Sequence, residues 1–290
     1  MNKKIGFYGG KFLPLHDGHI YSILYAAEKC DELHVFLFYN TFEEQKKIEE
    51  SVFPKKLLTS QTRELALNAE FKNYGHIKIH SIDSEKCFKN TKNTDDKIIR
   101  WDSESKEVIK IVGCDPDIVF SSEPEYEKFF KKSYPKAEIV CIDAKRELFN
   151  ISATAIRKKG EIKCWDYLSK AYQVLSAKSI VLFGDASLKR EIITDLTKLY
   201  KTTCVEMYNA NAEKLKNELL KARYSANKIF FINADENNIK DFEKFYNEQD
   251  LCIFFENEKY SEKIKTIKYQ KISPVNILEQ CIKIINKTLT

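Results

Sequence analysis

The order of elements at the N-terminus constrains the fold of this chain more than any other sequence feature. Residues 4–8 form an apolar run typical of a buried strand, Gly9 and Gly10 follow directly, and a helix with apolar residues on one side is expected over 17–30. Four of the eight glycines lie within the first eighteen residues, so the backbone there either approaches a neighbour closely or takes a positive φ. A strand, a glycine turn and a helix in this order predict the first half of a βαβ unit.

The same alternation continues along the chain and predicts an α/β protein with parallel sheets. In the first part, strands are expected over 4–8, 32–39, 76–82, 117–121 and 138–142, and helices over 17–30, 54–71, 101–112, 125–132, 155–159 and 162–176. A second series begins with a strand at 179–184, continues with strands at 203–207, 228–233, 251–255 and 265–271, and ends with a helix at 274–286. We therefore expect two domains, 1–177 and 178–290.

Composition narrows the class of protein. The chain is 43% hydrophobic and 31% charged, as soluble globular proteins are, and it has neither an apolar run long enough to span a membrane nor an expected signal peptide. The net charge is +5 and lysines alternate with glutamates, which argues against a nucleic-acid partner. The eight cysteines contain no C-x-x-C pair, and Cys30, Cys141 and Cys252 lie within apolar patterns. We therefore expect a reduced cytoplasmic protein with core cysteines, in which homo-oligomers are an open possibility.

A candidate phosphate site lies at the start of the first helix, where Lys11, His16, Gly18 and His19 follow the glycine turn. Free amides and the helix dipole attract anions at a helix N-terminus, and imidazoles there can donate hydrogen bonds to phosphate as charge develops. The alternative is an ordinary first helix that carries two surface histidines.

A second candidate lies at 151–157, in the run I-S-A-T-A-I-R. Ser152 or Thr154 can cap a short helix, and the same hydroxyls can hold phosphate. Arg157 offers a two-pronged donor for phosphate oxygens. The alternative is a capped helix with a surface arginine.

These two runs resemble the H-x-G-H and I-S-x-T-x-x-R motifs of the nucleotidyltransferase superfamily. The segment 10–21 is similar to the G-K-F-x-P-L-H-x-G-H-I-Y opening of NadR-type proteins, which are bifunctional nicotinamide mononucleotide (NMN) adenylyltransferases and ribosylnicotinamide kinases. Further segments that match the family are 31–35, 100–102, 116–123 and 143–146, with a weaker match at 224–232. The resemblance implies a Rossmann-like nucleotidyltransferase domain, followed by a smaller α/β domain that resembles a degenerate phosphate-binding-loop kinase.

The resemblance also implies a reaction and a site. AMP would pass from ATP to NMN, giving NAD and pyrophosphate, with Mg²⁺ carried by the phosphates of ATP and no metal site of the protein's own. The implied catalytic residues are Lys11, His16, His19 and Arg157. The implied nucleotide-binding residues are Gly9, Gly10, Phe12, Gly18, Ser121, Ser122, Glu123, Lys145, Arg146, Ser152 and Thr154. Trp101 would stack on the nicotinamide ring of the acceptor by a cation–π contact, or else it is a core residue.

The chain departs from the family at the kinase loop. Residues 183–190 read F-G-D-A-S-L-K-R where the kinase has G-x-x-x-x-G-K-[ST]. Leu188 replaces a glycine that lets the backbone approach phosphate, and Arg190 replaces the hydroxyl that binds Mg²⁺, so only Lys189 is kept. We expect no kinase activity. Two other functions of the chain stay open: cytidylyl or adenylyl transfer to another phosphorylated acceptor, and a non-catalytic nucleotide sensor.

Overall fold

The computed structural model describes residues 3–88, 97–184, 186–207, 212–234, 251–255, 269–272 and 276–289. Contacts divide the chain into two compact units, Met1–Tyr172 (unit 1) and Gln173–Thr290 (unit 2). The division falls inside helix α8 (Lys170–Ser176), shortly before the boundary expected at 177, and the assignment of two domains stays a prediction. No helix in the described ranges is long and apolar enough to cross a membrane.

Unit 1 is built on a parallel sheet with the strand order β3-β2-β1-β4-β5. Its strands are β1 (Ile5–Gly10), β2 (Glu32–Tyr39), β3 (Ile77–Asp83), β4 (Ile118–Ser121) and β5 (Glu138–Cys141). All five lie within two residues of the expected positions. The first strand is central because successive βα units are added on both sides of it, which brings the ends of β1 and β4 together. The α/β fold with parallel sheets is confirmed.

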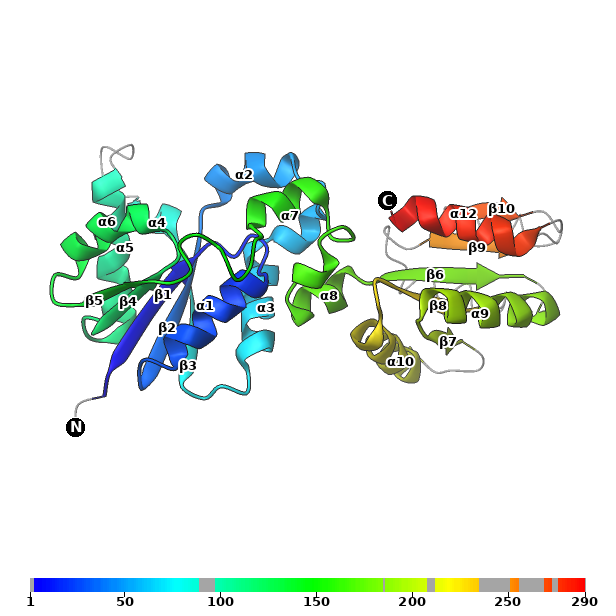
Figure 1. Cartoon of the computed structure of the whole chain (residues 1–290), viewed down its shortest axis with the longest axis horizontal. Helices are drawn as coiled ribbons and strands as arrows, with labels where there is room; N and C mark the ends of the chain where they lie inside the picture. The colour runs from blue at the N-terminus through cyan, green and yellow to red at the C-terminus, as the bar shows by residue number, and fades with distance from the viewer. Residues whose placement is uncertain are drawn as a thin grey trace. The chain divides into compact units, whose positions relative to one another are not determined.

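Helices cover both faces of this sheet (Figure 1). Alternate residues of the strands supply the two cores: Tyr8, Val35 and Phe120 lie in the core beneath α1 and α3, while Phe7 and Phe36 lie in the core beneath α5 and α6. The helices and 3₁₀ turns of the unit are α1 (Asp17–Ala27), α2 (Thr41–Glu49), η1 (Lys55–Leu58), α3 (Ser60–Phe71), α4 (Ser84–Phe88), α5 (Lys97–Val112), η2 (Pro124–Tyr126), α6 (Glu127–Ser133), α7 (Ala153–Lys159) and η3 (Trp165–Tyr167).

Several helices differ from the expectation. The sequence pattern did not predict α2, because its residues are mostly charged and give no apolar periodicity; it begins where the Asn40 side chain accepts a hydrogen bond from the Glu43 amide. The helix expected over 54–71 is split into η1 and α3, because Thr59 takes an extended conformation and caps α3. The helix expected over 162–176 is likewise η3 followed by α8.

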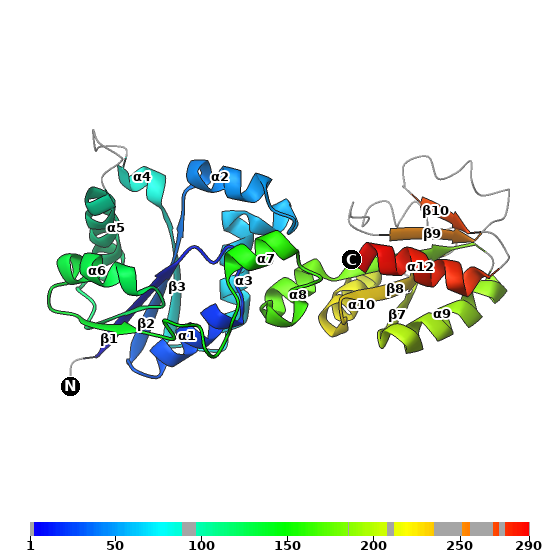
Figure 2. The same ribbon diagram turned by 45° about the horizontal axis from the view of Figure 1, so that its top comes forward.

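Unit 2 has a second parallel sheet, with the strand order β10-β9-β6-β8-β7. Its core lies between this sheet and helices α9 and α12, which both views show along the strands (Figures 1 and 2). The strands are β6 (Lys178–Phe183), β7 (Cys204–Glu206), β8 (Ile229–Asn233), β9 (Leu251–Phe255) and β10 (Tyr269–Ile272), and the helices are α9 (Ala186–Tyr200), α10 (Ala212–Ser225) and α12 (Ile277–Leu289). Most of the strand expected over 265–271 lies outside the described residues.

All eight cysteines are free, and their burial varies. Cys164, Cys252 and Cys281 are buried, whereas Cys30 is only partly buried. Cys141 is exposed, which corrects the expectation of a core position, because β5 is the edge strand of its sheet and pairs on one side only.

Candidate active site

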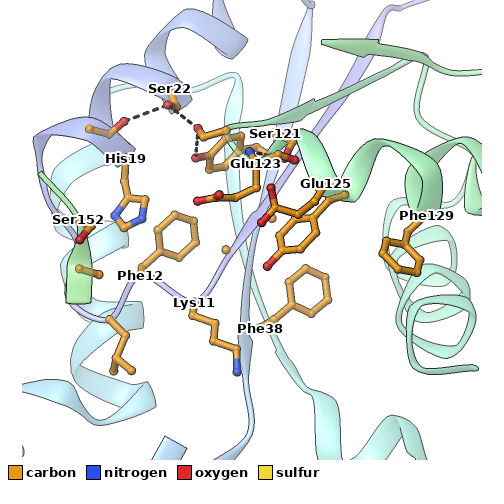
Figure 3. A pocket seen from close by; sticks show the side chains of 18 of the residues that line it. Lys11, Phe12, His19, Ser22, Phe38, Ser121, Glu123, Glu125, Phe129 and Ser152 are labelled. Atoms are coloured by element: carbon orange, nitrogen blue, oxygen red, sulfur yellow. Dashed lines mark hydrogen bonds between the residues drawn. The ribbon is translucent and has the colours of Figure 1, made fainter. Parts of the chain in front are cut away.

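A cavity of about 840 Å³ opens at the carboxyl ends of the strands of unit 1. This is where ligands bind in open parallel sheets, and the volume suits a nucleotide-sized molecule. Every predicted site residue except Lys145 lines it. Figure 3 shows His19 and Ser152 on one side of the cavity and Phe129 on the other.

The glycines at the end of β1 are needed for close approach rather than for an unusual backbone. A Cβ on Gly9 would lie 2.8 Å from the Phe38 ring, and one on Gly10 would lie 3.0 Å from the Phe12 ring. The positive φ in this loop belongs to Phe12, at 46°. The strained residue is therefore not a glycine, and its ring is buried against the site.

The two histidines form a close pair of rings, tilted by 31°, at the start of α1. Their ring centroids lie 3.8 Å apart, and the Phe12 ring meets His19 edge-on at 5.1 Å. Gly18 provides the space for this pair, since a Cβ there would lie 3.1 Å from the His16 ring. The alternative of two surface histidines is wrong for His16, which is 5% exposed.

Burial keeps both imidazoles neutral in the free protein. It lowers the pKa of His16 from 6.5 to about 3, with a smaller contribution from the positive charge of Arg146. Burial also lowers the pKa of His19 well below 6.5, and His16 and Arg146 add to the effect. The Nδ1 atoms of both rings are buried and have no hydrogen-bond partner among the described residues. A bound anion that neutralises the positive charge of Arg146 would remove one of the effects that lower the pKa values of His16 and His19.

Arg157 joins the two sequence motifs. Ser152 caps α7 by accepting a hydrogen bond from the Ala155 amide at 3.1 Å. One turn later, Nη1 of Arg157 donates to the Leu13 carbonyl at 2.6 Å, and its Nη2 donates to Oγ1 of Thr154 at 3.0 Å. The guanidinium is half-buried, which lowers its pKa from the usual value. The cation therefore lies beside the loop that carries the histidines.

Hydroxyl groups from β1, α1 and β4 meet along another wall of the cavity. The Ser22 Oγ donates to the Gly18 carbonyl at 2.9 Å and lies 3.1 Å from the Ser122 Oγ, which lies 3.4 Å from the Tyr8 hydroxyl (Figure 3). Ser121 closes a tight turn by accepting from the Glu123 amide at 3.1 Å. Tyr8 and Ser22 were not expected in the site, because the sequence pattern assigns Tyr8 to a buried strand and Ser22 to a helix that packs on the core.

Neighbouring basic residues after β5 have different surroundings. Nη2 of Arg146 pairs with Oε1 of Glu123 at 2.7 Å, and both residues line the cavity. Lys145 lies outside the lining: its side chain is 84% exposed, and its ammonium is 4.0 Å from Glu147. Asp143 and Arg146 both have positive φ, so the loop turns sharply and separates the two basic side chains.

Trp101 borders the cavity within an aromatic cluster. Its ring stacks on Phe129 at 5.2 Å with an interplanar angle of 7°, meets Phe130 edge-on at 5.0 Å and lies 5.1 Å from Tyr126. Trp101 is therefore both a partner of the core and a lining residue, so the two expectations for it are compatible. Arg100 and Glu104 line the cavity from the same helix. Glu104 lies four residues after Arg100 and three after Trp101, and this helical spacing is the signal that would have found it.

The carboxylates in the described ranges form no group of three with His or Cys that could hold a metal ion. Basic residues that line the cavity include Lys11, Arg100, Arg146 and Arg157, a donor set suited to phosphate rather than to a metal.

A strand, a loop and a helix N-terminus that meet at the edge of a parallel sheet are typical of nucleotide-binding proteins. The cytidylyltransferase-like family model matches residues 7–159, and the chain belongs to this family. Among curated relatives, the trifunctional NAD biosynthesis/regulator protein NadR of Escherichia coli (strain K12) is 28% identical over 211 residues, which cover 71% of this chain and 49% of that protein. NadR of Salmonella typhimurium matches to the same extent, so the chain spans about half the length of the curated relatives it matches.

Solved structures share the fold. A crystal structure of NadR in complex with NAD and AMP-PNP aligns with 99% of this chain and 96% of its own, at a TM-score of 0.68 and 14% identity. A NadR structure in complex with NR aligns with 88% of this chain and 81% of its own, at a TM-score of 0.61 and 16% identity. The resemblance to NadR-type proteins is confirmed, and the fold likeness extends over both units.

Proposed function

We propose that this protein is an NMN adenylyltransferase, which transfers AMP from ATP to NMN and forms NAD and pyrophosphate. The observation that carries the proposal is the junction of the two phosphate motifs, where Arg157 on α7 binds the carbonyl of Leu13 beside the histidine pair. The role of the curated NadR relatives in NAD biosynthesis supports NMN as the acceptor.

The chemistry needs positioning and charge stabilisation. An oxygen of the NMN 5′-phosphate attacks the α-phosphorus of ATP, a new P–O bond forms, and the bond to the bridging oxygen breaks so that pyrophosphate leaves with its electron pair. Lys11, His16, His19 and Arg157 stabilise the charge that develops on the leaving group. Mg²⁺ enters as part of the MgATP substrate and neutralises phosphate charge. Because the imidazoles are neutral, each carries a proton on one ring nitrogen only, and this N–H can donate a hydrogen bond.

The aromatic cluster around Trp101 is the proposed place for the acceptor base. A cationic nicotinamide ring over an indole gains about 0.5–2 kcal/mol from the cation–π contact. Glu123 and Arg146 form an ion pair at 2.7 Å and line the same cavity. When this pair separates, the guanidinium of Arg146 can bind the acceptor phosphate.

The nearest alternative keeps the mechanism and changes the base or the acceptor, since the matching family model is cytidylyltransferase-like. The deciding experiment supplies ATP or CTP with NMN, nicotinate mononucleotide or a polyol phosphate, and follows pyrophosphate release. We expect release only with ATP and NMN, together with NAD. Turnover of another pair and no NAD would overturn the acceptor assignment. Binding of ATP without turnover of any acceptor would favour the sensor.

We also propose that unit 2 has no ribosylnicotinamide kinase activity. Lys189 is fully buried, and its ammonium donates to the Ala234 carbonyl at 2.5 Å instead of facing an open loop. Gly184 has φ +111, and a Cβ built there would lie 2.6 Å from the Phe255 carbonyl, so chain from β9 fills the space beside the loop. Leu188 packs against the core of the unit. These contacts support a structural role for unit 2, and a role in assembly, such as a homo-oligomer, is part of the same proposal.

The kinase test uses His16→Ala protein, so that NMN is not consumed by the first site. Ribosylnicotinamide and MgATP are supplied, and NMN is measured by chromatography. We expect none. Steady NMN formation that is lost on Lys189→Met, which keeps the volume of the buried side chain, would make the chain bifunctional. We place the protein in the cytoplasm on the same proposal, with small-molecule substrates and neither nucleic acid nor membrane as a partner.

A further inference from the structure

An ion pair between α2 and α3 lies behind residues 11–16, the segment between β1 and α1 that we call the phosphate loop. Nη2 of Arg63 binds Oε2 of Glu44 at 2.6 Å, and both residues are 1% exposed. Neither residue belongs to a motif, and α2 itself gave no sequence signal. Replacing a buried pair of this kind with apolar residues is often neutral or stabilising, so stability alone does not account for it.

The pair contacts Lys11 in two ways. Nη1 of Arg63 donates to the main-chain carbonyl of Lys11 at 2.7 Å. The Lys11 ammonium lies 3.6 Å from Oε1 of Glu44, an oxygen that is buried and has no hydrogen-bond partner among the described residues. Arg63 therefore fixes the backbone of Lys11, and the carboxylate that Arg63 holds in place attracts its side chain.

The phosphate loop is thus held by two arginines on alternate carbonyls. Arg63 binds the carbonyl of Lys11, and Arg157 binds that of Leu13. Between them, Phe12 has its positive φ, which needs support from its surroundings. Glu43 adds a third anchor, since its carboxylate lies 3.7 Å from the Lys11 ammonium.

We propose that Arg63 and Glu44 are positioning residues that hold the Lys11 ammonium toward the phosphates of ATP. The inference rests on the proposed function, in which Lys11 binds those phosphates. The flat guanidinium is needed because it donates to a carbonyl and a carboxylate at once, which a lysine ammonium does less well.

The test is a double-mutant cycle on MgATP binding, measured by calorimetry without any acceptor. Lys11→Ala should raise the dissociation constant about 10- to 100-fold, the range of one charge-assisted hydrogen bond. Arg63→Met should raise it about tenfold in the wild-type background and by less than about twofold when Lys11 is already alanine. Leu67→Ala, a buried change one turn further along α3, is the matched control and should leave the affinity unchanged.

Arg63→Met leaves a buried carboxylate unpaired, so Arg63→Met with Glu44→Leu is made as well. This double variant should fold and show the same loss of affinity. An equal effect of the Arg63 change with and without the Lys11 side chain would overturn the positioning role, even if the protein makes NAD. A coupled cycle in a protein that makes no NAD would keep the positioning role and reject the acceptor. Absence of ATP binding by the wild-type protein would overturn both.

Discussion

Lowering the pH from 7 to 5 should destabilise unit 1, and His16→Gln should remove a defined part of that loss. The folded protein keeps His16 neutral because burial lowers its pKa to about 3, whereas the unfolded chain takes up a proton near pH 6.5. Unfolding therefore binds a proton between these values. The contribution is fully present above pH 6.5 and is lost progressively as the pH falls toward 3.

The magnitude follows from the two pKa values. For one histidine with pKa values of 6.5 unfolded and about 3 folded, the free energy of unfolding drops by about 2 kcal/mol between pH 7 and pH 5. His19, whose pKa is also lowered by burial, should contribute in the same direction. His34 and His80 have lowered pKa values too, but they are present in both proteins and cancel in the comparison.

The assay is urea unfolding at pH 7 and pH 5, followed by tryptophan fluorescence. Both tryptophans, Trp101 and Trp165, lie in unit 1, so the signal reports on the unit that holds the site. His16→Gln should lose about 2 kcal/mol less than wild type over this range. His76→Gln, which replaces an exposed imidazole, is the control and should keep the wild-type difference. Equal pH dependence in His16→Gln and wild type would refute the assignment of a buried neutral imidazole.

Three further predictions concern catalysis and packing. His19→Ala and Arg157→Ala should each lower kcat about 10²–10³-fold, far more than they perturb folding as measured by the urea midpoint; unchanged turnover would make the residue structural. Gly9→Ala should destabilise unit 1 by about 1–3 kcal/mol, because its Cβ would lie 2.8 Å from an aromatic ring. Gly75→Ala is the control and should have little effect, since nothing lies within 4 Å of a Cβ there. Equal urea midpoints for the two variants would contradict this prediction. Trp101→Leu should raise KM for NMN more than for ATP, and equal changes in initial-rate kinetics would remove it from the acceptor site.

Local sequence was sufficient to predict the elements and motifs of this protein that depend only on contiguous residues. The apolar run over 4–8, the glycine pair and the helix after Pro14 predicted β1 and α1, because each depends on neighbours within a few positions. The two phosphate motifs were visible for the same reason. The two motifs can contribute to one site although they lie far apart in the sequence, since the strand order of a parallel sheet brings their elements to the same edge.

Backbone detail inside the motifs was less predictable. The sequence predicted either a close approach or a positive φ at the glycines, and the structure shows the close approach at Gly9 and Gly10. The positive φ of the loop occurs at Phe12, because the buried ring and the carbonyl contacts on either side outweigh its intrinsic preference. The sequence treats Lys145 and Arg146 alike, but only Arg146 lines the cavity, because the loop turns at two residues of positive φ and Glu123 binds the guanidinium.

The tertiary structure alone decided which charged residues lie behind the site. Arg63 and Glu44 meet Lys11 across separations of 52 and 33 residues, and α2 has no apolar periodicity from which its place could be read. The packing of whole helices against the sheet determines which charged residues meet. The energetic contribution of such an ion pair depends on its burial, which cannot be derived from composition. The sequence by itself therefore determined the order of elements and the two motifs on which the proposed phosphate chemistry rests, whereas packing determined the charge environment around those motifs.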